Sequence, residues 1–120
     1  MLISLNSNKP VTRIPHRKQF DAWRSRLSRV EFDAICEELG RRVQEGEVHT
    51  SSWIPGGDWT GTVYQPIYDK ACKRDPVAAG LCFGLILWHV MMQRPDKWSY
   101  GRYEKNGIPI EGLTYFRFDS

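Results

Sequence analysis

The chain has 120 residues, a formal net charge of +3 and three cysteines. We expect a single domain over residues 1–120, with residues 1–15 able to form an extended arm, because a chain of this length buries a core without disulfide bonds. The cysteines show neither a CxxC pattern nor the spacing of zinc ligands, which favours free thiols in a reducing compartment. The N-terminal residues lack the apolar core of a signal peptide. These features together favour a cytoplasmic protein without a metal or a cofactor.

Positive charge is concentrated at the start of the chain. Residues 1–30 carry seven basic side chains against one carboxylate, Asp21, whereas residues 31–60 are acidic on balance. This asymmetry favours an anionic partner, either nucleic acid or an acidic protein surface. The alternative is that these charges pair within the fold and keep the surface soluble.

The first predicted elements are a short strand and an amphipathic helix. Residues 2–5 are apolar enough for a strand, and a polar connector follows them. The helix begins near Pro15 and places Phe20, Trp23 and Leu27 on one face, most of its arginines lying elsewhere. We expect it to end near Leu27.

A second helix, over residues 29–45, has the clearest local signature in the chain. Ser28 and Glu31 have the spacing of a capping box, in which each side chain bonds the other residue's backbone N–H. Leu27 and Phe32 occupy the positions of a hydrophobic staple around this start. The apolar stripe of this helix is predicted to be Phe32, Ile35, Cys36, Leu39 and Val43.

The third long helix, residues 76–93, is apolar nearly all round. Asp75 is its predicted cap, and the proline after it suits the first helical position. Such a helix must be surrounded by other elements of a soluble domain, and it is too short to span a bilayer comfortably, since that takes about 20 residues. Gly80 and Gly84 share one face, and the cost of about 1 kcal/mol for each glycine would be offset by a closely packed neighbouring helix. His89 is the single histidine of this apolar helix, and we expect it to be a core residue that is hydrogen bonded to a carbonyl group.

The last part of the chain, residues 98–118, predicts a β-hairpin. Asn106-Gly107 is a strong signal for a two-residue turn, which places Lys105 opposite Ile108. Counting outward from this turn pairs Arg102 with Glu111, Tyr100 with Leu113 and Trp98 with Tyr115.

The predicted class is therefore α+β. About four helices, including a short one at residues 66–74, pack around the apolar helix 76–93, with a short strand near 48–54 and the hairpin at 98–118. The order helix, strand, helix, helix, strand, turn, strand resembles that of winged helix-turn-helix domains over roughly the last three quarters of the chain. The resemblance implies DNA binding through the third helix and the wing. The helix in that position lacks side chains that bond a base edge, which favours a protein interface or an enclosed core instead.

A loop rich in glycine and tryptophan follows the predicted strand. It holds Trp53, Asp58 and Trp59, and either presents its indoles to a ligand or forms a rigid turn that Asp58 caps while the indoles cover the edge of the core. A small hydrolase could use His49, Ser51 and Asp58, because a nucleophile needs a base within hydrogen-bond reach. The loop has no GxSxG elbow, and its glycine pair is not followed by the Lys and Ser or Thr of a phosphate-binding loop.

Two basic groups are the other candidate sites. Around the first helix, a basic set could contact phosphates, or could form a solvated face with Asp21 and later carboxylates as partners; its members are His16, Arg17, Lys18, Arg24, Arg26 and Arg29. In the hairpin, cations alternate with aromatic side chains, a composition that can stack bases or can cover the apolar helix.

These features favour a small non-catalytic binding module that engages nucleic acid or an acidic macromolecular partner. One alternative is an assembly subunit, such as a homodimer, which uses apolar and aromatic surface; a second is the small hydrolase. We predict no catalytic residue and no membrane contact for the leading hypothesis. Its binding residues would be Arg17, Lys18, Arg24, Arg26, Trp53, Asp58, Trp59, Arg102 and Lys105.

Overall fold

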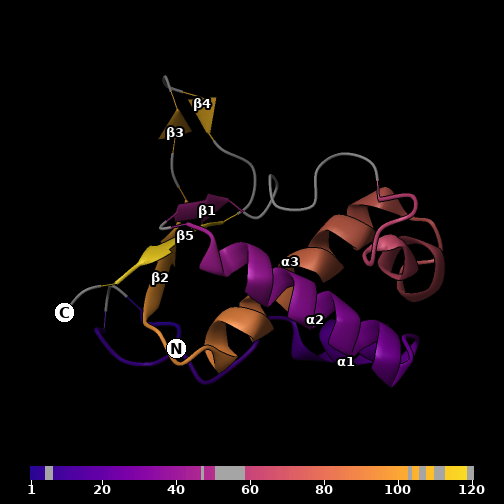
Figure 1. Cartoon of the computed structure of the whole chain (residues 1–120), viewed down its shortest axis with the longest axis horizontal. Helices are drawn as coiled ribbons and strands as arrows, with labels where there is room; N and C mark the ends of the chain where they lie inside the picture. Colours follow the sequence, from indigo (N-terminus) through magenta and orange to yellow (C-terminus); the bar gives the residue numbers. More distant parts are fainter. Residues whose placement is uncertain are drawn as a thin grey trace.

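The computed structural model of the chain describes residues 1–4, 7–46, 59–102 and 113–118 in full, and residues 48–50, 104–105 and 108–109 by their backbone. Helices and strands both contribute to one fold, so the α+β class is confirmed (Figure 1). The elements in chain order are α1 (Arg17–Ser25), α2 (Arg29–Gln44), β1 (Val48–Thr50), the π-helical turn η1 (Ile67–Ala71), α3 (Pro76–Gln93), β2 (Trp98–Gly101), β3 (Glu104–Lys105), β4 (Ile108–Pro109) and β5 (Thr114–Arg117).

Helix α2 begins as the sequence predicts. The Ser28 hydroxyl accepts a hydrogen bond from the Glu31 N–H at 3.1 Å, and the Glu31 carboxylate accepts one from the Ser28 N–H at 2.9 Å. These two bonds satisfy backbone donors that a helix start otherwise leaves without partners. The stripe of α2 is turned into the core as predicted, with only Cys36 partly exposed; its buried members are Phe32, Ile35, Leu39 and Val43.

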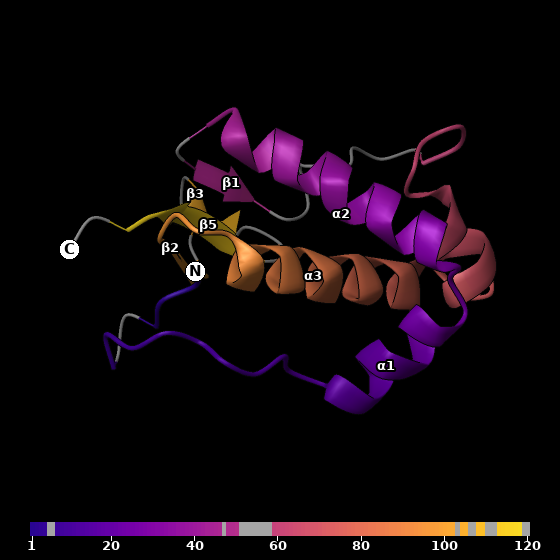
Figure 2. The ribbon, with the colours of Figure 1, turned by 60° about the horizontal axis from the view of Figure 1, so that its bottom comes forward.

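Helix α3 is the centre of the core, which confirms the main prediction from the sequence. Asp75 caps it by accepting hydrogen bonds from the N–H groups of Val77 and Ala78. Helices α1 and α2 and the turn η1 all pack against α3, and Figure 2 shows α3 lying between α1 and α2. By length and composition α3 could cross a membrane, but half of its apolar window is buried inside the fold, as in the core helix of a globular protein.

One face of α3 is left uncovered near its start. Val77 and Leu81 are 73% and 55% exposed. Apart from the neighbouring residues and nearby backbone of α3 itself, no atom of the described residues lies within 4 Å of a Cβ placed on Gly80 or Gly84. The neighbouring helix that we expected against these glycines is therefore absent from the described part of the chain.

The short helix predicted at residues 66–74 is replaced by a π-helical turn and a sharp reversal. The regular pattern ends at Ala71, and Lys73 and Arg74 adopt left-handed backbone conformations with φ of 51° and 64°. Two successive left-handed residues cannot continue a right-handed helix. They turn the chain directly into the cap at Asp75, which explains why the helix ends earlier than predicted.

The larger sheet has three antiparallel strands in the order β1-β5-β2. Lys105 pairs with Ile108 as predicted, but Trp98 pairs with Arg117 and Tyr100 with Tyr115, so the predicted register of β2 was wrong by two residues. The β2–β5 ladder is separated from the smaller β3–β4 ladder by unequal lengths of chain. Two residues (102–103) connect β2 to β3, whereas four (110–113) connect β4 to β5. An even shift keeps each side chain on its face of the sheet, so Trp98 and Tyr115 still lie in the core. The resemblance to winged helix-turn-helix domains remains a prediction.

The residues before α1 pack along the domain. Leu2 forms a bridge with Trp98 and Ile3 with Pro10, where a strand over residues 2–5 was predicted. Leu2, Ile3 and Ile14 are all buried. The backbone carbonyl of Ile3 accepts a hydrogen bond from Ser99 Oγ at 2.7 Å, which ties this segment to β2.

Candidate anion-binding site

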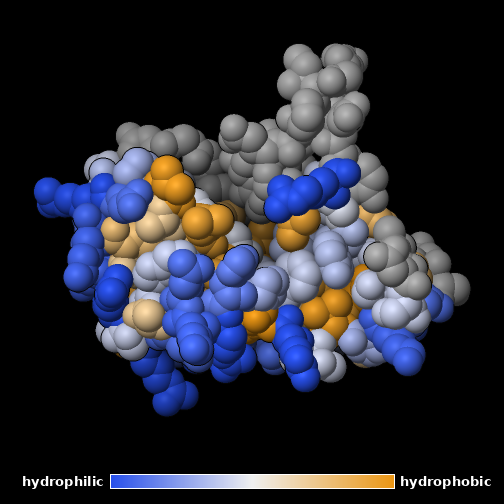
Figure 3. Space-filling view, turned by 180° about the vertical axis from the view of Figure 1, so that it is seen from behind, coloured by the Kyte–Doolittle hydropathy of each residue, from blue (hydrophilic) through white to orange (hydrophobic). Residues whose placement is uncertain are grey.

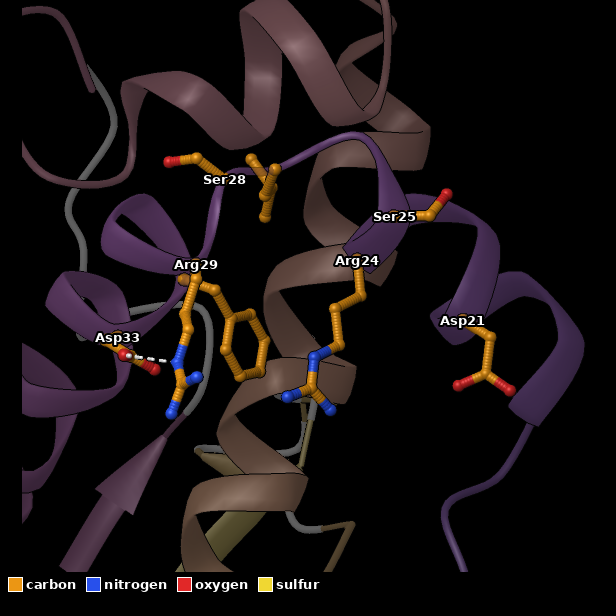
Figure 4. A pocket seen from close by; sticks show the side chains of 8 residues that line it. Asp21, Arg24, Ser25, Ser28, Arg29 and Asp33 are labelled. Atoms are coloured by element: carbon orange, nitrogen blue, oxygen red, sulfur yellow. Dashed lines mark ion pairs between the residues drawn. The ribbon is translucent and has the colours of Figure 1, made fainter.

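A pocket lies at the corner where α1 ends and α2 begins. Leu27 and Phe32, the two staple residues, are both buried and fix the angle between the helices. The pocket at this corner has a volume of about 540 Å³ (Figure 4). Its walls are formed by Asp21, Arg24, Ser25, Leu27, Ser28, Arg29, Phe32 and Asp33.

Arg24 has the most distinctive geometry in this pocket. Its guanidinium carbon lies 4.2 Å from the centre of the Phe32 ring, a cation–π arrangement. The Phe32 ring is itself held by ring contacts with Phe20 and His89, at centroid distances of 6.4 and 5.7 Å. Among the described residues no group hydrogen bonds to the Arg24 side chain or forms an ion pair with it. An exposed guanidinium with all its donors available is thus held in place by a buried aromatic cluster.

The neighbouring cations are engaged in the fold. Arg17 bonds Asp21 at 3.0 Å, and Arg29 lies 3.7 Å from Asp33 with 94% of its side chain exposed. Arg26 donates to the carbonyl oxygen of Ala71 at 2.7 Å, and so connects α1 to η1. The walls of the pocket carry two cations (Arg24 and Arg29) and two carboxylates (Asp21 and Asp33), and Arg24 is the cation without a carboxylate partner among the described residues.

The predicted binding residues are distributed over separate regions. Arg17, Lys18 and Arg24 lie on α1 and are exposed, whereas Arg102 follows β2 at the opposite end of the fold (Figure 1). Trp59 is half-buried, with its ring 6.2 Å from that of Tyr64 and 5.7 Å from that of Phe83. The candidates that fall outside the fully described residues are Trp53, Asp58, the side chain of Lys105 and the hydrolase set His49, Ser51 and Asp58.

The sequence did not identify Phe32 or Asp33 as parts of a site. Phe32 was assigned to the core stripe of α2, which is correct, but its ring also supports Arg24 from the neighbouring helix. The signal that could have shown this is the staple, because Leu27 and Phe32 set the corner that brings the end of α1 over the start of α2.

His89 lies beneath this corner. Its ring packs 5.8 Å from that of Phe20 and 5.7 Å from that of Phe32, and the structure describes no hydrogen bond from it to a carbonyl group. Burial lowers the pKa of His89 below the ordinary value of 6.5, and the charges of Arg24 and Arg17 lower it further. The neutral imidazole is therefore the form that the folded protein favours.

We expect the free energy of unfolding to fall as the pH drops below 6.5 because of His89. The unfolded chain then binds a proton that the folded protein, with its lowered pKa, does not bind. A His89→Leu variant should lose this part of the pH dependence. Urea unfolding of both proteins between about pH 7 and pH 5 checks it, and parallel pH profiles would contradict it.

The described residues offer no activated nucleophile or metal site. Burial raises the pKa of the Cys36 thiol to about 11, and burial also raises the pKa values of the Cys72 and Cys82 thiols. A thiol with a raised pKa is a poor nucleophile at neutral pH. Within the described part of the chain, no three His, Cys, Asp or Glu side chains converge in a way that could hold a metal ion.

Comparison of the chain with protein-family models, with curated proteins and with solved structures gives no match.

Proposed function

We propose that this chain is a small non-catalytic binding module that engages an anionic macromolecule through the corner of α1 and α2. The observation that supports this most strongly is the state of Arg24. A guanidinium has five N–H donors in a planar fork that matches phosphate and carboxylate oxygens. Contact with the Phe32 ring holds that fork in place, so a ligand loses less side-chain entropy when it binds.

Nucleic acid is the partner that this corner fits best. Arg29 is exposed and lines the same pocket as Arg24, so neighbouring phosphates of one strand could be contacted at once. Such contacts give affinity with little sequence choice. An acidic protein surface is the other anionic partner.

The affinity for a fluorescent oligonucleotide should decrease steeply with salt. The logarithm of the binding constant is expected to fall with the logarithm of salt concentration by about 0.7–0.9 for each phosphate contacted. Arg24→Gln should weaken binding about 10-fold or more, because hydrogen bonds to charged groups contribute about 1.5–3 kcal/mol. Fluorescence anisotropy measures both effects.

Arg41→Gln is the matched control for this experiment. Arg41 is also an exposed arginine, but it lies on α2 and pairs with Glu38 and Glu45. Equal weakening by the two variants would contradict a specific role for the corner, and absence of binding at low salt would exclude nucleic acid. Retention of polyglutamate by a protein that ignores the oligonucleotide would assign the corner to an acidic protein.

The uncovered face of α3 supports a second candidate function, assembly of two copies into a homodimer. Val77 and Leu81 are exposed there, and no side chain of the described residues comes within 4 Å of a Cβ placed on Gly80 or Gly84. Figure 3 shows hydrophobic residues gathered at the end of the molecule where α3 begins, with hydrophilic residues around them. Exposed apolar patches of this kind are typical of interaction sites.

A homodimer through this face should have twice the mass of the chain by light scattering. Leu81→Arg is expected to reduce that mass to one chain, because it places a charge in the apolar contact. Trp59→Ala is a poor test, since Trp59 packs on Phe83 of the core and its loss would disturb the fold. A wild-type protein that is monomeric at all concentrations would contradict this candidate.

A further inference from the structure

We infer that the pocket at the corner of α1 and α2 accepts one unpaired base of a single-stranded nucleic acid, stacked on the guanidinium of Arg24. This inference rests on the proposed function, because it requires nucleic acid to be the partner. It goes further by assigning the pocket to a base, whereas the exposed cations around it contact phosphates.

The first argument is the planar surface that Arg24 provides. One side of its guanidinium lies over the Phe32 ring, and the residue is exposed at the wall of the pocket. Unpaired bases stack on arginine planes as well as on aromatic rings. A base placed against Arg24 would cover the face of the guanidinium that Phe32 leaves open, while Phe20 holds the Phe32 ring from the side in an edge-to-face contact.

The second argument is the presence of carboxylates in the pocket. A site for phosphate alone would not be lined by Asp21 and Asp33, because a carboxylate repels a phosphate. A base edge differs, since its amino and ring N–H groups donate hydrogen bonds that a carboxylate accepts. Asp33 is the available acceptor, because its only described cation partner, Arg29, lies 3.7 Å away, beyond a normal hydrogen bond.

The size and shape of the pocket agree with one nucleotide. Its volume of about 540 Å³ lies in the usual range of about 300–1,000 Å³ for small-molecule sites. Leu27 and Phe32 give it an apolar floor. A base that is paired and stacked within a duplex cannot enter such a hollow, so the pocket selects single strands.

Guanine is the base that suits Asp33 best. Its ring N–H and amino group lie side by side and can donate to both carboxylate oxygens, whereas uracil and thymine have one N–H donor. We therefore expect tighter binding of an oligouridine in which one uridine is replaced by guanosine than of the oligouridine itself, by about tenfold. A thymidine oligonucleotide with one deoxyguanosine should show the same preference, unless the 2′-hydroxyl is also read.

The test measures anisotropy of these oligonucleotides, and of a duplex of equal charge, with the wild-type protein and two variants. Arg24→Lys keeps the charge but removes the plane, and should weaken single-strand binding about tenfold more than it weakens duplex binding. Asp33→Asn should remove the preference for guanosine, because the amide offers one acceptor oxygen where the carboxylate offers two, and should change binding of plain oligouridine less. Asp33 is exposed, so this variant is expected to fold normally.

The outcomes separate the inference from the proposed function. Equal binding of single strands and duplex, with Arg24→Lys equivalent to wild type, would overturn the pocket assignment and leave the basic corner as a phosphate-binding surface. A guanosine preference that survives in Asp33→Asn would overturn the role of that carboxylate. Absence of binding to every oligonucleotide would overturn both the pocket assignment and nucleic acid as the partner in the proposed function.

Discussion

Replacement of Leu87 by alanine is expected to lower the free energy of unfolding by about 2–5 kcal/mol. Leu87 lies on α3 and has no exposed surface, so its side chain is enclosed by the core on all sides. The loss combines the transfer of its methyl groups with the cavity left between packed elements. Urea unfolding of wild type and variant measures the difference.

Leu81→Ala is the matched control for this prediction. It is the same substitution in the same helix, but Leu81 is 55% exposed. The change should stay within about 0.5 kcal/mol, because alanine is also a good helix former. Equal destabilisation of the two variants would contradict the burial of the Leu87 face of α3 in the core.

Asp96→Ala is expected to lower the free energy of unfolding by about 2–3 kcal/mol. The Asp96 carboxylate accepts hydrogen bonds from Arg94 at 2.8 Å and from Arg117 at 3.0 Å. Arg94 also donates to the Gly40 carbonyl at 3.0 Å, so this group connects α2, the end of α3 and β5. Removal of the carboxylate leaves two partly buried guanidinium groups without this anion.

Two measurements test this prediction. Asp33→Ala removes the carboxylate of an exposed pair and should cost less than about 1 kcal/mol. Burial would by itself raise the pKa of Asp96, but the hydrogen bonds and charge of Arg94 outweigh it, so the pKa falls from 3.8 to about 2. The stability contributed by this carboxylate is present above pH 3.8 and lost as the pH falls toward 2, and Asp96→Asn should lack that loss. Identical acid unfolding of wild type and Asp96→Asn would contradict it.

The sequence predicted those elements whose ends are determined locally. Ser28 and Glu31 determine the start of α2, and Asp75 with the proline after it determines the start of α3, because each cap bonds backbone groups within three residues. The pairing of Lys105 with Ile108 followed from the turn between them. Local chemistry of this kind needs no knowledge of the rest of the fold.

Features that depend on several elements could not be predicted in this way. The register of β2 and β5 depends on residues between the two ladders, so counting from the turn gave the wrong partners for Trp98 and Tyr100. The early end of the helix at Ala71 depends on the left-handed conformations of Lys73 and Arg74. Glycine and asparagine are the residues that usually indicate such a conformation, and neither occupies these two positions.

The candidate site was predicted only in part. Charge counting identified the basic α1 region and included Arg24, but it could not distinguish Arg24 from Arg26. The difference arises in three dimensions, because Arg26 donates to the carbonyl of Ala71, while Arg24 lies over the Phe32 ring and donates to no group of the described residues. Which arginine is available for a partner is decided by packing.

The arginine side-chain signals in ¹⁵N–¹H spectra, followed while a single-stranded oligonucleotide is added, give the most direct test of the role of Arg24. The Nε–H signal of Arg24 is predicted to shift in proportion to the bound fraction, while that of Arg94, which is bonded to Asp96, stays in place. An unchanged Arg24 signal at saturation, with other arginines shifted, would show that the partner binds elsewhere and would contradict the assignment of this corner.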